Sequence, residues 1–144
     1  MAIEVKDFYL NTLLDSRYRI VKKIGEGGMG NVYLAEHAVL KKKVAVKILH
    51  LGLSSRKDAV ERFRREAVAA SNIGQENIVD VTDFGSTEQG NAYFVMEYVE
   101  GTALSDIVKK EAPLPLHYVV AITAQICQAL FSAHSKGIIH RDLK

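Results

Sequence analysis

Alternation of polar and apolar residues dominates the first third of the chain. Arg17 to Gly25 alternates in this way and runs into a glycine-rich turn, which predicts a strand. A second strand is expected over Asn31 to Glu36, with Val32 and Leu34 on one face. A third is expected over Val44 to Leu49, a β-branched run that follows a lysine-rich turn. Short turns between successive strands favour an antiparallel meander.

The period of the pattern then becomes that of a helix. From Ser54 to Asn72 the apolar residues fall at helical spacing. The N-terminus of this helix could be capped by Ser54, Ser55 or Asp58, and Gly74 ends it. Two more strands and two more helices follow, over Ile78 to Phe84, Ala92 to Tyr98, Ala103 to Lys110 and Leu116 to Lys136. The order predicts an α+β fold, with a five-stranded antiparallel sheet and one packed helix, followed by the start of a helical region.

Length and composition narrow the class of protein. A chain of 144 residues suits one domain, and 48% apolar with 25% charged residues is typical of a soluble globular protein. A net charge of only +2 argues against a nucleic-acid binder. The single cysteine, Cys127, is expected to be buried; it cannot form an internal disulfide, which favours the reducing cytoplasm. We expect no signal peptide, and no apolar run near the ~20 residues that a membrane span needs.

A glycine motif is the first candidate for chemistry. Residues 25–30 read G-E-G-G-M-G and match G-x-G-x-x-G, a spacing that dinucleotide-binding folds also use. The dinucleotide version requires a helix after the glycines and an acidic residue about 20 positions later. Here a strand containing Val32 follows, and the later strand carries Lys47, whose charge suits a phosphate rather than a ribose hydroxyl. This pattern argues against a dinucleotide-binding enzyme.

Lys47 lies in the middle of an apolar strand, where an unpaired ammonium would be costly to bury. The next helix offers Glu66 as its anionic partner, and His140-Arg141-Asp142 ends the long apolar stretch. These four features, in this order, resemble the protein kinase family: a glycine-rich loop, a strand lysine, a helix glutamate and H-R-D. The amino-acid sequence from Arg17 to Ala35 is similar to that of bacterial kinases of the eukaryotic-like type.

The resemblance extends from Tyr18 to the end of the chain and implies a division into parts. Residues 1–17 would be an amino-terminal extension, 18–98 the ATP-binding small lobe, and 99–144 the hinge and an incomplete large lobe that ends in the catalytic loop. The fold is therefore expected to be kinase-like, and the cofactors to be ATP and Mg²⁺.

By position, the resemblance assigns a set of residues to ATP. They are Ile24, Gly25, Gly27, Gly28, Gly30, Val32, Ala45, Lys47, Met96, Glu97 and Val99. Val32 and Ala45 would sandwich the adenine, Met96 would guard the back of its pocket, and the backbones of Glu97 and Val99 would form the hinge that hydrogen-bonds it.

The resemblance also implies catalytic roles. Lys47, paired with Glu66, would contact the α- and β-phosphates, and Asp142 would orient the substrate hydroxyl. Lys144, two residues after Asp142, is typical of the serine/threonine branch and would contact the transferred phosphate. The family's asparagine and D-F-G, which hold Mg²⁺, would lie beyond Lys144, so no metal site is predicted within this chain.

Asp83-Phe84-Gly85 spells D-F-G but precedes H-R-D, whereas the family's metal-binding tripeptide follows it. We interpret it as a coincidence, with Phe84 packing and Gly85 serving a turn.

The resulting expectation is a serine/threonine protein kinase that transfers phosphate from ATP to protein hydroxyls. The 144 residues alone should bind ATP yet be inactive, because the Mg²⁺ ligands would be missing. The alternative is a non-catalytic remnant that binds a nucleotide or a partner. The apolar helix over residues 116–136 would lose part of its cover, which favours self-association.

Overall fold

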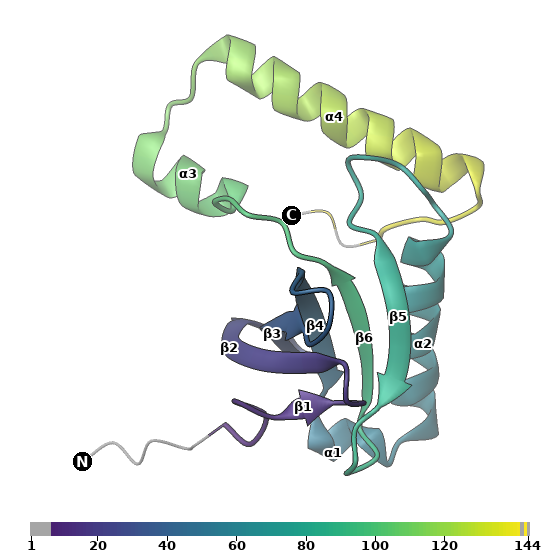
Figure 1. The fold of residues 1–144 in the computed structure, drawn as a ribbon. Coiled ribbons are helices and arrows are strands. Elements are labelled where there is room, and N and C mark those ends of the chain that lie inside the picture. Colours follow the sequence, from purple (N-terminus) through teal and green to yellow (C-terminus); the bar gives the residue numbers. More distant parts are fainter. Residues whose placement is uncertain (1–6, 142, 144) are drawn as a thin grey trace. The chain divides into compact units, whose positions relative to one another are not determined.

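The computed structural model describes residues 7–141 and 143. Six antiparallel strands form one sheet in the order β1-β2-β3-β4-β6-β5 (Figure 1). Their bounds are β1 Leu13–Leu14, β2 Tyr18–Glu26, β3 Gly30–His37, β4 Lys43–Leu49, β5 Val81–Ser86 and β6 Ala92–Glu97. The helices are α1 Leu51–Ser54, α2 Lys57–Ser71, α3 Leu104–Glu111 and α4 Leu116–Ser135. The described chain separates into two compact units, one of residues 7–68 and 80–98 and one of residues 69–79 and 99–141 with 143.

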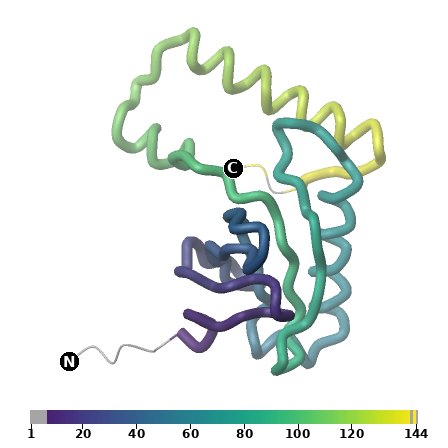
Figure 2. The backbone as a smooth tube through the Cα atoms, viewed as in Figure 1, coloured from purple at the N-terminus to yellow at the C-terminus, as the bar shows by residue number. Residues whose placement is uncertain are grey.

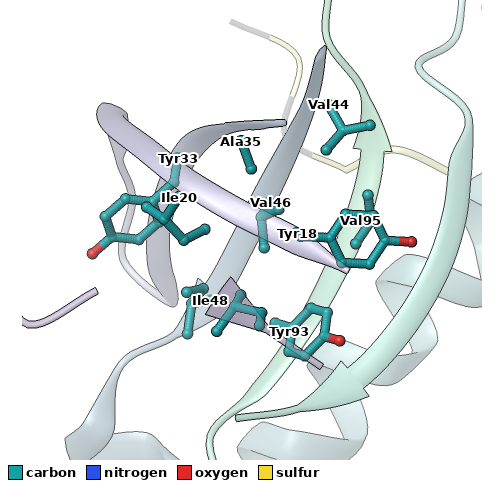
Figure 3. Packing of buried hydrophobic residues seen from close by; sticks show 10 residues of the cluster. Tyr18, Ile20, Tyr33, Ala35, Val44, Val46, Ile48, Tyr93 and Val95 are labelled. Atoms are coloured by element: carbon teal, nitrogen blue, oxygen red, sulfur yellow. The ribbon is translucent and has the colours of Figure 1, made fainter. Parts of the chain in front are cut away.

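Strand alternation gives the sheet two distinct faces, because successive side chains point to opposite sides. On the face that we call the inner face, buried residues of five strands form one core (Figure 3). Its members are Leu14, Tyr18, Ile20, Tyr33, Ala35, Val44, Val46, Ile48, Tyr93 and Val95. The opposite, outer face carries the residues in between, such as Leu49, Ala92 and Phe94, and α2 packs on it through Phe63 and Ala67.

The two ends of the sheet are tied together by tyrosine hydroxyls. Tyr93 of β6 donates to Asp15, in the turn after β1, and Tyr18 of β2 donates to Asp83 of β5 over 2.8 Å. Arg17 adds an ion pair with Asp83 at 2.7 Å. The turn after β1 therefore meets the β5–β6 end of the sheet, as the purple and teal segments show in Figure 2.

Residues 7–17 contribute further to the inner core. Leu14 is buried, and Tyr9 packs against the core with its ring centroid 5.9 Å from that of Tyr33. The Tyr33 hydroxyl donates to both carboxylate oxygens of Asp7, at 2.9 and 3.0 Å. This segment is thus part of the sheet's packing.

Two details of the predicted elements were wrong. The sheet has six strands rather than five, because Leu13–Leu14 pairs with β2; a two-residue strand is too short to show alternation. The helix expected over Ser54 to Asn72 begins later, at Lys57, and a separate short helix that was not expected, α1, ends at Ser54. Of the three residues proposed as caps, Asp58 instead lies in the first turn of α2, where a negative charge favours the helix.

The early D-F-G tripeptide lies within β5. Phe84 packs as expected, with its ring centroid 6.3 Å from that of Phe63. The turn expected at Gly85 was wrong, because Gly85 is paired with Tyr93 inside the strand. A Cβ at Gly85 would lie 2.7 Å from the Tyr93 ring and 2.9 Å from an Asp15 carboxylate oxygen. Glycine is needed here to make room for the hydrogen bond between Tyr93 and Asp15.

The second unit is helical. Lys136, which follows α4, donates to the carbonyl oxygens of Asn72 and Ile73 at 2.6 and 2.8 Å, and Asn77 donates to Gln125 at 3.1 Å. Among the described residues of α4, only Ala133 is buried, and Phe131 is 76% exposed. Cys127 is exposed, so its predicted burial was wrong.

α4 is also long and apolar enough to cross a membrane by length and composition alone. The expectation that no apolar run approaches this length was therefore wrong. Core helices of soluble proteins pass the same criterion, so this single helix does not identify a membrane protein.

Candidate functional site

The residues expected to hold a nucleotide gather on the outer face of the sheet. In the β3–β4 ladder Val32 pairs with Lys47, and in the β4–β6 ladder Ala45 pairs with Met96. Directly paired residues point to the same side, so β3, β4 and β6 present these four side chains on one surface. Val32 and Met96 are half-buried, whereas Ala45 is buried.

Lys47 and Glu66 form the ion pair expected from the sequence. The Nζ atom of Lys47 lies 2.6 Å from Oε1 of Glu66, which reaches it from α2. The lysine side chain is 19% exposed and the glutamate 47%. Nζ also lies 5.5 Å from the ring centroid of Phe94 and 5.9 Å from that of Phe63, within the range of cation–π attraction.

These contacts hold the ammonium in one place. The carboxylate approaches Lys47 from α2, and Phe94 is its partner in the β4–β6 ladder. An ammonium has three donors, and Glu66 accepts from one of them, so Lys47 can still bind a second anion. The sequence did not identify the two rings as neighbours of Lys47, although Phe94 and Met96 lie two positions apart on the same strand and therefore share one face.

The glycine-rich segment is the turn between β2 and β3. Gly27 N–H donates to the carbonyl of Gly30 over 3.0 Å, which closes the turn. A Cβ at Gly30 would lie 2.2 Å from the carbonyl oxygen of Ile48, so the packing of β3 on β4 excludes any other residue there. Gly30 is therefore required by the fold itself.

The other loop glycines have room around them. A Cβ at Gly25 or Gly27 would meet its nearest heavy atom at 3.6 Å, an ordinary contact, and at Gly28 it would meet nothing within 4 Å. None of the three has a positive φ angle. Neither packing nor backbone conformation requires glycine at these positions, whereas close approach of a ligand to the backbone would require it.

Beside this loop, Lys23 and Glu26 form an ion pair at 2.7 Å. The hydrogen bond from Lys23 lowers the pKa of the Glu26 carboxyl. Ile24 lies between them, at an irregularity of the β2–β3 pairing, and is 41% exposed.

A histidine that the sequence did not single out contacts the same loop. His50 directly follows β4, and its backbone N–H donates to the carbonyl of Met29 over 2.9 Å. Its ring atom Nε2 lies 2.9 Å from the carbonyl oxygen of Gly27. In the sequence, the only indication of this role was that His50 directly follows the strand that carries Lys47.

The expected hinge is only partly placed. Glu97 closes β6, and its backbone N–H donates to Asp80 over 3.0 Å, so a backbone contact with adenine would have to come from its carbonyl. Val99 belongs to the second compact unit, whereas Glu97 belongs to the first. Asp142 and Lys144 lie outside the described residues.

Within residues 7–141 and 143, no three or more histidine, cysteine, aspartate or glutamate side chains are grouped to hold a metal ion. The described residues therefore form no metal site from three or more such side chains.

A twisted antiparallel sheet with one helix on its outer face, a glycine turn and a lysine–glutamate pair defines the nucleotide-binding lobe of a protein kinase. The protein kinase domain family matches residues 18–144, and the chain belongs to this family. The match includes α4, which is therefore a helix of the kinase domain.

Bacterial kinases are among the similar proteins. The serine/threonine-protein kinase pkn3 of Myxococcus xanthus is 44% identical over 138 residues, and PrkC of Bacillus subtilis is 43% identical over 131 residues. These stretches cover 96% and 91% of this chain but 25% and 20% of the relatives. The chain thus spans about a quarter of the length of such relatives or less.

The fold agrees with solved kinase structures. The PknI kinase domain of Mycobacterium tuberculosis matches with a TM-score of 0.75 and 29% identity, over 93% of this chain and 55% of that domain. The kinase-like fold expected from the sequence is confirmed.

Proposed function

We propose that this chain is the ATP-binding part of a serine/threonine protein kinase of the bacterial eukaryotic-like type, which acts in the cytoplasm on protein hydroxyls. The observation that carries the proposal is the ion pair between Lys47 and Glu66, placed on the same sheet face as Val32, Ala45 and Met96. A fixed ammonium beside an apolar strip suits a ligand with one flat apolar end and one anionic end, which is the chemistry of a nucleotide.

The apolar residues receive the base in this proposal. Val32 and Ala45, which point to the same side of the sheet, contact one face of the adenine, and Met96 limits the depth to which it enters. Glu97 offers its backbone carbonyl to the edge of the adenine. Ile24, exposed at the mouth of the glycine turn, covers the ribose side.

The polar residues hold the phosphates. Glycines 25, 27 and 28 let the backbone approach the phosphate oxygens without a Cβ in the way. Lys47 balances the charge of the α- and β-phosphates, while Glu66 keeps its ammonium in position.

Bound ATP supplies the phosphoryl group. Asp142 orients the accepting hydroxyl, and Lys144 neutralises charge on the group in transit. The described residues include no cluster of three or more metal-ligating side chains, and we expect the 144 residues alone to bind ATP without turning it over.

A thermal melt with and without saturating ATP tests the binding. A ligand at 100 times its dissociation constant adds about 2.7 kcal/mol, which raises the melting temperature of a domain of this size by several degrees. Lys47→Ala should abolish the shift. The matched control Lys57→Ala, at an exposed lysine that begins α2, should keep it. An equal shift in both variants would contradict the assignment of Lys47.

The proposal also includes self-association through α4. Leu116, Val120 and Phe131 are 77%, 59% and 76% exposed, which is unusual for large apolar side chains on one helix. Sedimentation velocity should show concentration-dependent oligomers that Phe131→Ser weakens. A monomer at all concentrations would remove this part of the proposal.

A further inference from the structure

His50 makes two contacts with the glycine turn, one from its backbone and one from its ring. Its N–H donates to Met29, and its Nε2 lies 2.9 Å from the carbonyl oxygen of Gly27. A carbonyl oxygen can only accept a hydrogen bond, so Nε2 must carry the proton. One residue at the end of β4 therefore holds two carbonyls of the turn.

Holding a carbonyl also orients the amide on the other side of the same peptide bond. The peptide unit is planar and trans, so the carbonyl of Gly27 and the N–H of Gly28 point in opposite directions. With the carbonyl directed at His50, the N–H of Gly28 is directed away from it. Among the described residues, no acceptor for this N–H is found.

The peptide between Gly27 and Gly28 needs such a restraint because neither residue has a side chain, and Met29 is the turn residue that packs against the outer core. A Cβ at Gly28 would touch nothing within 4 Å, and the turn is closed by a single hydrogen bond between Gly27 and Gly30. Glycine has the greatest conformational freedom of all residues, so an unrestrained peptide here would rotate easily.

We propose that His50 is a positioning residue, whose Nε2–H holds the Gly27 carbonyl so that the Gly28 N–H faces the phosphates of a bound nucleotide. This inference rests on the proposed function for the identity of the ligand. His50 itself does not contact the nucleotide in this proposal. The restraint on the turn exists before any ligand binds.

Glutamine offers a close test, because its amide Nε2 is also a donor at the end of a side chain of similar reach. Titration calorimetry with ATP should show binding about three- to tenfold weaker in His50→Ala, the change expected for loss of one hydrogen bond, with most of it restored in His50→Gln. Equal affinity in wild type and His50→Ala, or no recovery in His50→Gln, would overturn the proposal.

A second measurement separates this inference from the proposed function. Backbone ¹⁵N relaxation of the chain without nucleotide should show lower order at Gly27 and Gly28 in His50→Ala and wild-type order in His50→Gln. If ATP binds neither the wild type nor the variants, the proposed function fails, and the relaxation data alone test whether His50 restrains the turn. Unchanged order in His50→Ala would overturn it.

Discussion

The two faces of the sheet are built from the same strands and differ in what they leave accessible. Every residue of the inner core is at most 8% exposed, and the buried tyrosines Tyr33 and Tyr93 each give their hydroxyl to a carboxylate. On the outer face, α2 covers the part near Phe94, whereas Val32 and Leu34 of β3 are half-buried and Lys47 is 19% exposed.

Under the proposed function, stability depends on residues of one face and nucleotide binding on residues of the other, both carried by the same strands. A substitution on one strand should therefore affect either the free energy of unfolding or the nucleotide affinity, depending on the face to which its side chain points. Three predictions test this separation, and they are ordered by the size of the expected effect.

The largest difference is expected between two isoleucines of β2. Ile20 is fully buried in the inner core, and Ile20→Ala should lower the free energy of unfolding by about 2–5 kcal/mol through lost burial and a cavity. Ile24 is 41% exposed, and Ile24→Ala should cost less than about 0.5 kcal/mol while weakening ATP binding. Urea denaturation and ATP titration measure the two effects. Equal losses of stability would contradict the separation of the faces.

A smaller difference is expected between two glycines. Gly85→Ala would place its Cβ 2.7 Å from the Tyr93 ring, and the forced shift should cost about 1–3 kcal/mol. Gly28→Ala meets nothing within 4 Å, so stability should stay within about 0.5 kcal/mol while ATP affinity falls. The same denaturation and titration experiments apply. Gly28→Ala with full ATP affinity would show that the turn does not approach the ligand closely.

The smallest effect concerns the buried hydroxyls of the inner face. Burial, together with the hydrogen bond to Asp7, raises the pKa of Tyr33 above its ordinary value of 10.0; burial and Asp15 raise that of Tyr93. A raised pKa stabilises the folded state at neutral pH, and this contribution is lost as the pH rises above 10. Tyrosinate absorbance from these residues should therefore appear together with unfolding.

Tyr33→Phe provides the control for this titration. At neutral pH it should be less stable by about 0.5–1.5 kcal/mol, the value of one hydrogen bond, and its stability should fall less steeply at alkaline pH. Ionisation of all tyrosines near pH 10 in a protein that stays folded would contradict the prediction.

Sequence reasoning predicted the strands well where both faces carry a pattern. In β4, Val44, Val46 and Ile48 alternate with Ala45 and Lys47, and a lysine among apolar neighbours pointed to its partner in the next helix. These signals are local: they need only the period of a strand and the cost of burying a charge.

β1 was not predicted because a two-residue strand is too short to show alternation, although its partner β2 is close in sequence. The other features that were not predicted depend on contacts between distant parts of the chain, as at Gly85, where Tyr93 and Asp15 occupy the space that a side chain would need. The contact of His50 with Gly27 joins residues 23 positions apart. No periodicity in the sequence indicates such contacts, because each depends on how the folded sheet brings distant residues together.

The closure of the sheet has a consequence for synthesis on the ribosome. Asp15 is separated from Tyr93 by 78 positions, and Tyr9 from its hydrogen-bond partner Asn91 by 82. At about 5–20 residues per second, Tyr9 and Asp15 are made roughly 4–16 s before these partners. β1 can pair with β2 during that interval, but the hydrogen bonds from this segment to Asn91 and Tyr93 cannot form, so they are among the last contacts of the sheet to be made.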